Sequence, residues 1–223
     1  MNEIILIILI CTTLLAIYIL YKLYDKRGLY FLLPLFNILT FILSFKITTI
    51  LKLNINLGIV SYIGTLSIIF IFLIKYNNKE TKELEKIIML TNIFTAICLV
   101  IINYCIPAIT ETISIHIESS IVYNYKIIIA YPLIMFLSQY LVAKLYTFVE
   151  SIQTNISISI LLTYIITAII YTIIFYIICY IKILSIKDSI YIGISTYIIG
   201  LIITIINIIF INYLVKSKKV TKW

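Results

Sequence analysis

Long apolar stretches separated by short polar segments dominate this chain. A membrane-spanning helix needs about 20 predominantly apolar residues. The stretches of roughly this length are Ile4–Tyr21, Leu29–Phe45, Leu57–Ile74, Ile87–Ile109, Ile127–Ala143, Ile156–Ile181 and Ser189–Val215. They are continuous and do not alternate between apolar and polar residues, as the strands of a membrane β-barrel would. The pattern therefore predicts an all-α, polytopic transmembrane bundle of seven helices, or of six if one stretch does not span.

The amino-acid composition also indicates a membrane protein. Hydrophobic residues make up 63% of the 223 residues and charged residues 12%, whereas a soluble domain is about 45–50% apolar and about 25% charged. A soluble globule of this size could not bury so much apolar surface. We therefore expect one integral membrane domain over residues 1–223, multi-pass in the cell membrane. Membrane lipid is its expected surrounding, and nucleic acid is not an expected partner.

Lysine and arginine are divided unequally between the two sides of this predicted bundle. Of the 17 such residues, 12 follow the first, third, fifth or seventh helix, and 5 follow the second, fourth or sixth. The side richer in lysine and arginine is usually cytoplasmic. The charges thus predict that the N-terminus lies outside and the C-terminus in the cytoplasm.

The longest polar stretch is Lys75–Lys86, with the sequence KYNNKETKELEK. Its charges alternate in sign, and pairs such as Lys79 and Glu83 stand at helical spacing. We expect this stretch to form a solvated helical extension of the fourth helix.

Sequence signals for an enzyme are nearly absent. All nine acidic residues fall in loops or at the ends of the predicted helices, whereas an ionisable group in mid-membrane usually marks function. The chain has no P-loop, H-E-x-x-H or G-x-S-x-G motif. A Cys–His peptidase would need Cys105 and His116 to meet. We expect no enzymatic activity, no cofactor and no bound metal.

Neutral polar residues inside the predicted helices are the candidates for a solute-binding site. Ser138 and Gln139 are adjacent on the fifth helix, so their side chains point about 100° apart and cannot both point straight at one ligand. Tyr164 on the sixth helix and Asn207 on the seventh are further candidates. Hydrogen bonds between helices are the alternative role for these residues, and also for Asn37, Ser44, Asn92, Asn103 and Thr167.

Lys46, at the end of the second helix, is the deepest cation of the predicted bundle. Its side chain can extend to the outer interface, because a lysine near a helix end reaches water at little cost. Alternatively, it lines an outward-facing cavity and contacts an electron-rich ligand.

A stripe of small and polar residues follows the seventh helix. Gly193, Gly200 and Asn207 recur at intervals of seven residues, with Tyr197 and Thr204 between them. Small residues on one face allow close packing of membrane helices. The stripe therefore predicts a packing face, with the lining of a substrate path as the alternative.

The order of several motifs resembles the vitamin-uptake-like family of queuosine precursor transporters. The resemblance covers most of the chain, and divergence is visible where relatives carry acids and this chain has Phe70, Ile74 and Val142. The matching features are YKLYDKRGLY (Tyr21–Tyr30), Lys46, LNINLG (Leu53–Gly58), the helix around Gly64 that ends in KYNNKE (Lys75–Glu80), the pair Ser138–Gln139, and Asn155 with Ser157.

This resemblance implies an importer of a queuosine precursor of the 7-deazaguanine type. Lys46, Ser138 and Gln139 would then line the site. Stacking faces would come from Tyr62, Tyr140, Tyr164 and Tyr197.

Two other functions remain open on the sequence alone. The chain could be a divergent substrate-binding membrane subunit for another small solute, working with separate ATPase partners, or it could form a homo-oligomer. It could also be a membrane assembly or immunity protein that transports nothing.

Overall fold

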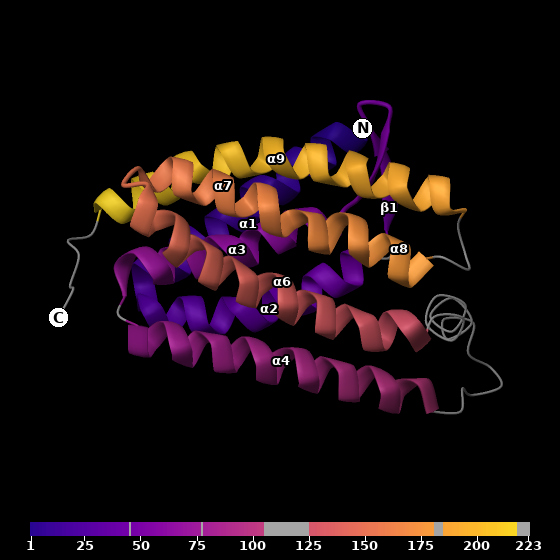
Figure 1. Ribbon diagram of the computed structural model, residues 1–223, viewed down its shortest axis with the longest axis horizontal. Helices are drawn as coiled ribbons and strands as arrows, with labels where there is room; N and C mark the ends of the chain where they lie inside the picture. The colour runs from indigo at the N-terminus through magenta and orange to yellow at the C-terminus, as the bar shows by residue number, and fades with distance from the viewer. Residues whose placement is uncertain (45, 77, 105–124, 181–184, 218–223) are drawn as a thin grey trace.

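The computed structural model describes residues 1–44, 46–76, 78–104, 125–180 and 185–217. Within these ranges the chain forms seven helical rods and one short hairpin (Figure 1). The rods are α1 (Asn2–Tyr24), α2 (Lys26–Ser44), α3 (Gly58–Lys75), α4 (Asn78–Tyr104), α6 (Tyr125–Ile152), the continuous rod of α7 (Ile156–Ile169), η2 (Ile170–Ile174) and α8 (Phe175–Tyr180), and α9 (Ile186–Ser217). The described part of each predicted apolar stretch falls almost entirely in one rod, which confirms the all-α bundle.

Six of the rods in the described chain are long and apolar enough to cross a membrane. They are α1, α2, α3, α6, the rod from α7 to α8, and α9. The remaining rod, α4, packs against α2, α3 and α6. These helices fit a multi-pass membrane protein.

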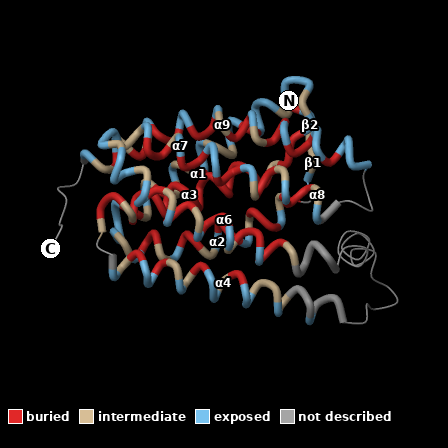
Figure 2. Tube along the Cα trace, in the orientation of Figure 1, coloured by how far each residue is buried: buried red, intermediate tan, exposed pale blue. Residues whose placement is uncertain are grey.

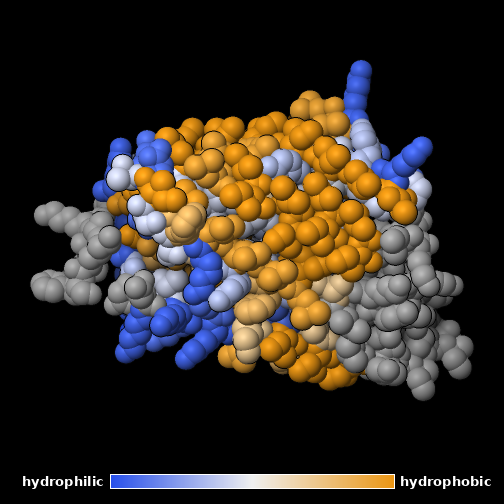
Figure 3. Space-filling view, viewed as in Figure 1, coloured by the Kyte–Doolittle hydropathy of each residue, from blue (hydrophilic) through white to orange (hydrophobic). Residues whose placement is uncertain are grey.

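Successive rods run in opposite directions along the bundle (Figure 1). The α1–α2, α3–α4 and α6–α7 junctions and the end of α9 therefore lie at one end, which we call the lysine-rich end. Its described cations are Lys22, Lys26, Arg27, Lys75, Lys79, Lys82, Lys86, Lys144 and Lys216. Hydrophilic residues gather at this end, and hydrophobic residues cover the middle of the face (Figure 3). The fold thus gathers most of the described cations at one end of the bundle, as expected. The cytoplasmic position of this end stays a prediction.

The helix α3 is the centre of the bundle. All its residues are buried except Leu73, which is half-buried, and it packs against α1, α2, α4, α6 and α9 (Figure 2). A helix that is hydrophobic on all sides can be covered on all sides. Gly64 lets α1 and α2 approach closely, because a Cβ atom there would lie 2.8 Å from Thr13 Cγ2 and 3.0 Å from Phe36 Cδ2.

A two-stranded hairpin covers the other end of the bundle, which we call the hairpin end. The strands β1 (Ile47–Ile50) and β2 (Leu53–Asn56) pair antiparallel. The turn residues Leu51 and Lys52 both have positive φ, 51° and 65°, as a two-residue type I′ hairpin turn requires. The sequence analysis did not predict this hairpin.

Both neighbouring helices hold the hairpin in place. Asn2 Nδ2 of α1 donates to the Thr49 carbonyl over 3.0 Å. On the α9 side, the Asn56 backbone N–H donates to Thr196 Oγ1 over 3.0 Å. Ile55 of β2 is fully buried. The hairpin is therefore a fixed cover on the bundle.

The polar stretch Lys75–Lys86 is helical, as expected, from Asn78 onward, where α4 begins, whereas Lys75 ends α3 and Tyr76 is not helical. Lys26 Nζ forms an ion pair with Glu80 Oε1, and Tyr30 Oη donates to the Glu80 carbonyl over 3.2 Å. These contacts attach the start of α4 to α2.

A hydrogen bond also joins the α1–α2 and α3–α4 junctions. Tyr76 Oη donates to Asp25 Oδ1 over 2.9 Å. Burial raises the pKa of the Tyr76 hydroxyl above its ordinary value, and the nearby Tyr21 and Asp25 add to the rise. The hydroxyl therefore stays protonated at neutral pH and can act as the donor.

Candidate functional site

A group of buried polar and aromatic side chains lies where α2, α3, α6 and the α7–α8 rod meet. We call this group the polar cluster. Its members are each at most 1% exposed. They are Asn37, Ser44, Tyr62, Thr65, Tyr131, Ser138, Gln139 and Tyr171.

Two side-chain amides are the centre of the polar cluster. Gln139 Nε2 donates to Asn37 Oδ1 over 2.6 Å and to Thr65 Oγ1 over 3.3 Å. Tyr131 Oη donates to the backbone carbonyl of Asn37 over 2.7 Å. These bonds connect α6 with both α2 and α3.

Each amide also has one buried atom without a hydrogen-bond partner in the described chain. These atoms are the donor Asn37 Nδ2 and the acceptor Gln139 Oε1. A buried polar group without a partner costs about 1–3 kcal/mol, and the bilayer core offers no water to replace it. An unpaired donor and an unpaired acceptor thus flank the Asn37–Gln139 bond.

Aromatic rings line the neighbouring side of the polar cluster. Tyr62 of α3 stacks on Tyr171, with ring centroids 4.1 Å apart and planes 13° from parallel. The hydroxyls of Tyr171 and Ser44 are hydrogen-bonded over 3.0 Å. The Tyr62 hydroxyl has no partner among the residues described.

Tyr171 is positioned by the π-helix η2, which interrupts an otherwise α-helical rod. A π-helical turn changes the direction in which the following side chains point, and such turns are frequent at functional sites. Gly193 of α9 accommodates this turn, because a Cβ atom there would lie 2.9 Å from the Thr172 carbonyl oxygen. No sequence signal for the π-helix was recognised, so sequence reasoning missed Tyr171.

The structure places Ser138 and Gln139 in the polar cluster, with different contacts. Ser138 Oγ donates to the Met135 carbonyl of its own helix over 3.0 Å, whereas Gln139 reaches two other helices. The two adjacent side chains thus contact different groups, and the expectation that they cannot both point straight at one ligand stays a prediction. Of the remaining members, Asn37 and Ser44 were expected to bond between helices, and Thr65 and Tyr131 were missed.

The other three candidate residues lie elsewhere. Tyr164 is fully buried and stacks on Tyr197 with centroids 6.4 Å apart. Asn207 Nδ2 donates to Ser67 Oγ over 2.5 Å, between α9 and α3. Lys46 is exposed beside β1 at the hairpin end. The five predicted residues therefore do not form one site.

The glycine stripe on α9 is a packing face. Gly193 and Gly200 are both buried. A Cβ atom on Gly200 would clash with the hydroxyl of Tyr164 and lie 3.0 Å from Ile59 Cδ1. Close approach of α9 to α3 and α7 therefore depends on this glycine.

The polar cluster contains only neutral side chains, so it can bind a ligand by hydrogen bonds and stacking. Among the described residues, no three His, Cys, Asp or Glu side chains gather in a way that could hold a metal ion. Cys105 and His116, the pair considered for a peptidase, lie outside the described residues.

Comparisons of the chain with models of protein families, with curated proteins and with solved structures found no match.

Proposed function

We propose that this protein is a membrane importer of a small, neutral, planar solute, and that the polar cluster is its binding site. The unpaired donor and acceptor beside the stacked tyrosines carry this proposal. The motif resemblance implies that the solute is a queuosine precursor of the 7-deazaguanine type.

The hydrogen-bonding pattern of the two amides supports such a solute. Gln139 Oε1 can accept one bond, and Asn37 Nδ2 can donate one. A lactam edge, with adjacent N–H and C=O groups, offers the complementary pair. The pyrimidinone ring of 7-deazaguanine has this edge.

The aromatic side of the polar cluster supports a planar ring. Tyr62 and Tyr171 lie nearly parallel. Offset stacking of aromatic rings contributes about 0.5–1.5 kcal/mol beyond the area it buries. A flat heterocycle that entered between the two rings would replace their one stacking contact with two, whereas a flexible aliphatic solute would only break it.

The absence of charge among the members of the polar cluster favours a neutral solute. A charged group transferred there would lose its hydration without an opposite charge in the cluster. We therefore expect discrimination against charged analogues of the same shape.

Access to the polar cluster requires movement of helices. Asn37 lies seven residues before the end of α2, or roughly 10 Å from the hairpin end at 1.5 Å per residue. The Ser44–Tyr171 pair and the tightly packed Gly58 lie between. We expect α6 to separate from α2 and α3, so that the solute reaches the unpaired Gln139 Oε1 and Asn37 Nδ2.

Uptake of labelled 7-deazaguanine into bacterial cells that lack their own importer tests the proposal. Gln139→Leu removes the acceptor for the solute together with the Nε2 bonds to Asn37 and Thr65. Loss of the hydrogen bond to the solute should by itself lower uptake at limiting solute by about 3- to 10-fold. The control Thr147→Val changes an exposed residue of the same helix and should leave uptake unchanged. Membrane content and melting temperature of each variant show whether it is folded.

Two further measurements separate this function from the alternatives. Uptake by the purified protein in liposomes would exclude a subunit that depends on separate ATPase partners. If the well-expressed wild-type protein neither binds nor takes up the labelled solute, the proposal of a queuosine-precursor importer is wrong. A subunit for another solute and a membrane protein without transport activity then remain.

A further inference from the structure

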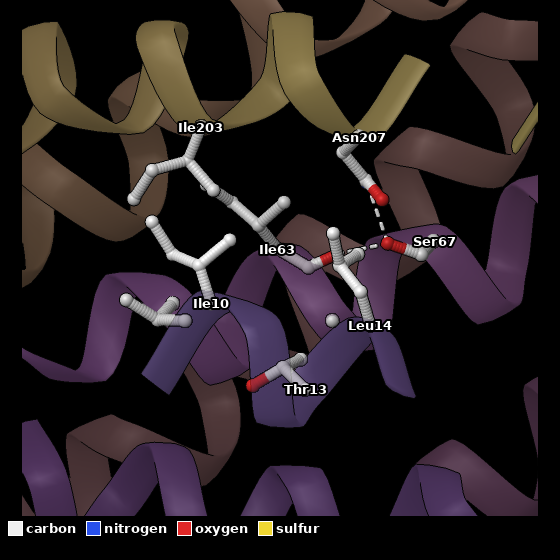
Figure 4. A pocket seen from close by; sticks show the side chains of 9 residues that line it. Ile10, Thr13, Leu14, Ile63, Ser67, Ile203 and Asn207 are labelled. Carbon is white, nitrogen blue, oxygen red and sulfur yellow. Dashed lines mark hydrogen bonds between the residues drawn. The ribbon is translucent and has the colours of Figure 1, made fainter. Parts of the chain in front are cut away.

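A small pocket lies between α1, α3 and α9, away from the polar cluster (Figure 4). It has room for about one water molecule. Leu14 of α1, Ile63 and Gly64 of α3 and Ile203 of α9 form much of its wall. Three polar side chains also line the pocket: Ser67, Asn207 and Thr13, whose hydroxyl donates to the Leu9 carbonyl of its own helix over 2.8 Å.

Asn207 is only 2% exposed, and its amide is half satisfied. Its Nδ2 donates to Ser67 Oγ over 2.5 Å, but its Oδ1 has no partner within the described ranges. The Ser67 hydroxyl donates its proton to the Ile63 carbonyl over 2.7 Å. Since a hydroxyl oxygen has two lone pairs, Ser67 Oγ can accept one bond more.

We propose that this pocket binds a single water molecule, which donates one hydrogen bond to Asn207 Oδ1 and one to Ser67 Oγ. The size of the pocket and its two available acceptors match one water, because buried waters typically make two to four such bonds. Lipid cannot supply these bonds. A metal cation fits less well, since none of the lining residues carries a negative charge to offset its lost hydration.

The water lies between two further polar contacts of α9, one with the strand β2 that leads into α3 and one with α3 itself. Near the hairpin end, the Asn56 N–H that precedes α3 donates to Thr196 Oγ1 over 3.0 Å. At the lysine-rich end, Lys75 Nζ donates to the Leu214 carbonyl over 3.0 Å. The water therefore belongs to a line of polar contacts that follows the α3–α9 interface through the bundle.

X-ray footprinting of the full-length protein in lipid nanodiscs can test this site. Irradiation splits bound water into hydroxyl radicals, which oxidise the side chains beside it. Ile203 lines the pocket and Ile199 does not, although both are 4% exposed and lie on the same helix. We expect Ile203 to be oxidised several-fold faster than Ile199.

The substitution Asn207→Leu removes the main acceptor and should reduce oxidation of Ile203 to the level of Ile199. Ser67→Ala removes the second acceptor and should reduce the oxidation of Ile203 in part. It replaces Asn207→Leu in the test if that variant does not fold. Asn212→Leu is the control, because Asn212 lies on the same helix but bonds to Ser157 instead. It should leave oxidation of Ile203 unchanged.

Two results would overturn the assignment of a water. One is equal oxidation of Ile203 and Ile199 in the wild-type protein. The other is a rise in melting temperature with sodium chloride, but not with potassium or choline chloride, that Asn207→Leu abolishes. The second result would assign the pocket to sodium.

Discussion

At the residue scale, the structure pairs polar side chains that are far apart in the sequence. Gln139 meets Asn37 and Thr65, and Asn207 meets Ser67. Each residue was recognisable as polar within an apolar stretch, but its partner was not. Interhelical hydrogen bonds of this kind contribute about 0.6 kcal/mol on average, so they select the arrangement of helices more than they drive insertion.

Lys75 provides the sharpest prediction for a single residue. It is 4% exposed, donates to the Leu214 carbonyl over 3.0 Å and lies 5.3 Å from the ring centroid of Tyr21. Leu214 is in the last turn of α9, where carbonyls lack partners within the helix. Lys75→Met keeps the aliphatic stem but loses the donor, and should lower the free energy of unfolding by about 1–3 kcal/mol.

Unfolding in mixed micelles, followed by circular dichroism, measures this change. Lys79→Met is the matched control, because Lys79 is exposed on α4. Equal stability of the two variants would show that the Lys75–Leu214 contact contributes nothing.

At the element scale, hydrophobic patterning located every helical rod but missed the features that shape the interior. The apolar stretches predicted the rods because the length of an apolar stretch can be read from the sequence without knowing what packs against it. The hairpin lacks the Asn-Gly or Asp-Gly pair that normally signals a type I′ turn, since Leu51 and Lys52 occupy these positions. The π-helix around Tyr171 is surrounded by isoleucines, which give no sign of it.

The hairpin turn can be tested by supplying the residues it lacks. Leu51 and Lys52 have positive φ, a conformation that costs an ordinary residue about 1 kcal/mol or more. The double change Leu51→Asn and Lys52→Gly should therefore stabilise the hairpin and slow amide hydrogen exchange in residues 47–56.

Asn54→Gly should have the opposite effect on exchange. Asn54 Oδ1 accepts a hydrogen bond from Thr49 Oγ1 over 2.8 Å across the strands, and glycine weakens a strand. Faster exchange in the double variant Leu51→Asn and Lys52→Gly would contradict the type I′ geometry.

At the scale of the whole molecule, the alternating direction of the rods converts loop charges into two unlike ends. The lysine-rich end carries the ion pair of Lys26 with Glu80 and the contact of Tyr76 with Asp25. The hairpin end carries the hairpin beside the start of α1. The two ends of the bundle therefore differ in charge, as the predicted orientation requires.

A reporter fused after Trp223 tests the orientation. Because the lysine-rich side of a membrane protein is usually cytoplasmic, a fluorescent protein that matures only in the cytoplasm should be bright there. Alkaline phosphatase, which is active only outside the cytoplasm, should be inactive at the same position. Active phosphatase after Trp223 would reverse the orientation and place the hairpin end inside.

Local sequence alone indicated a bundle of helical rods long and apolar enough to span a membrane, the position of each described rod and which loops share an end. These properties depend on local apolar length and on charge, which need no knowledge of neighbours. Only the tertiary structure decided which polar groups meet. In a rod that is apolar on nearly every side, periodicity does not reveal its rotation about its own axis. That rotation, set by packing around the buried helix α3, placed Gln139 and Asn207 in separate sites.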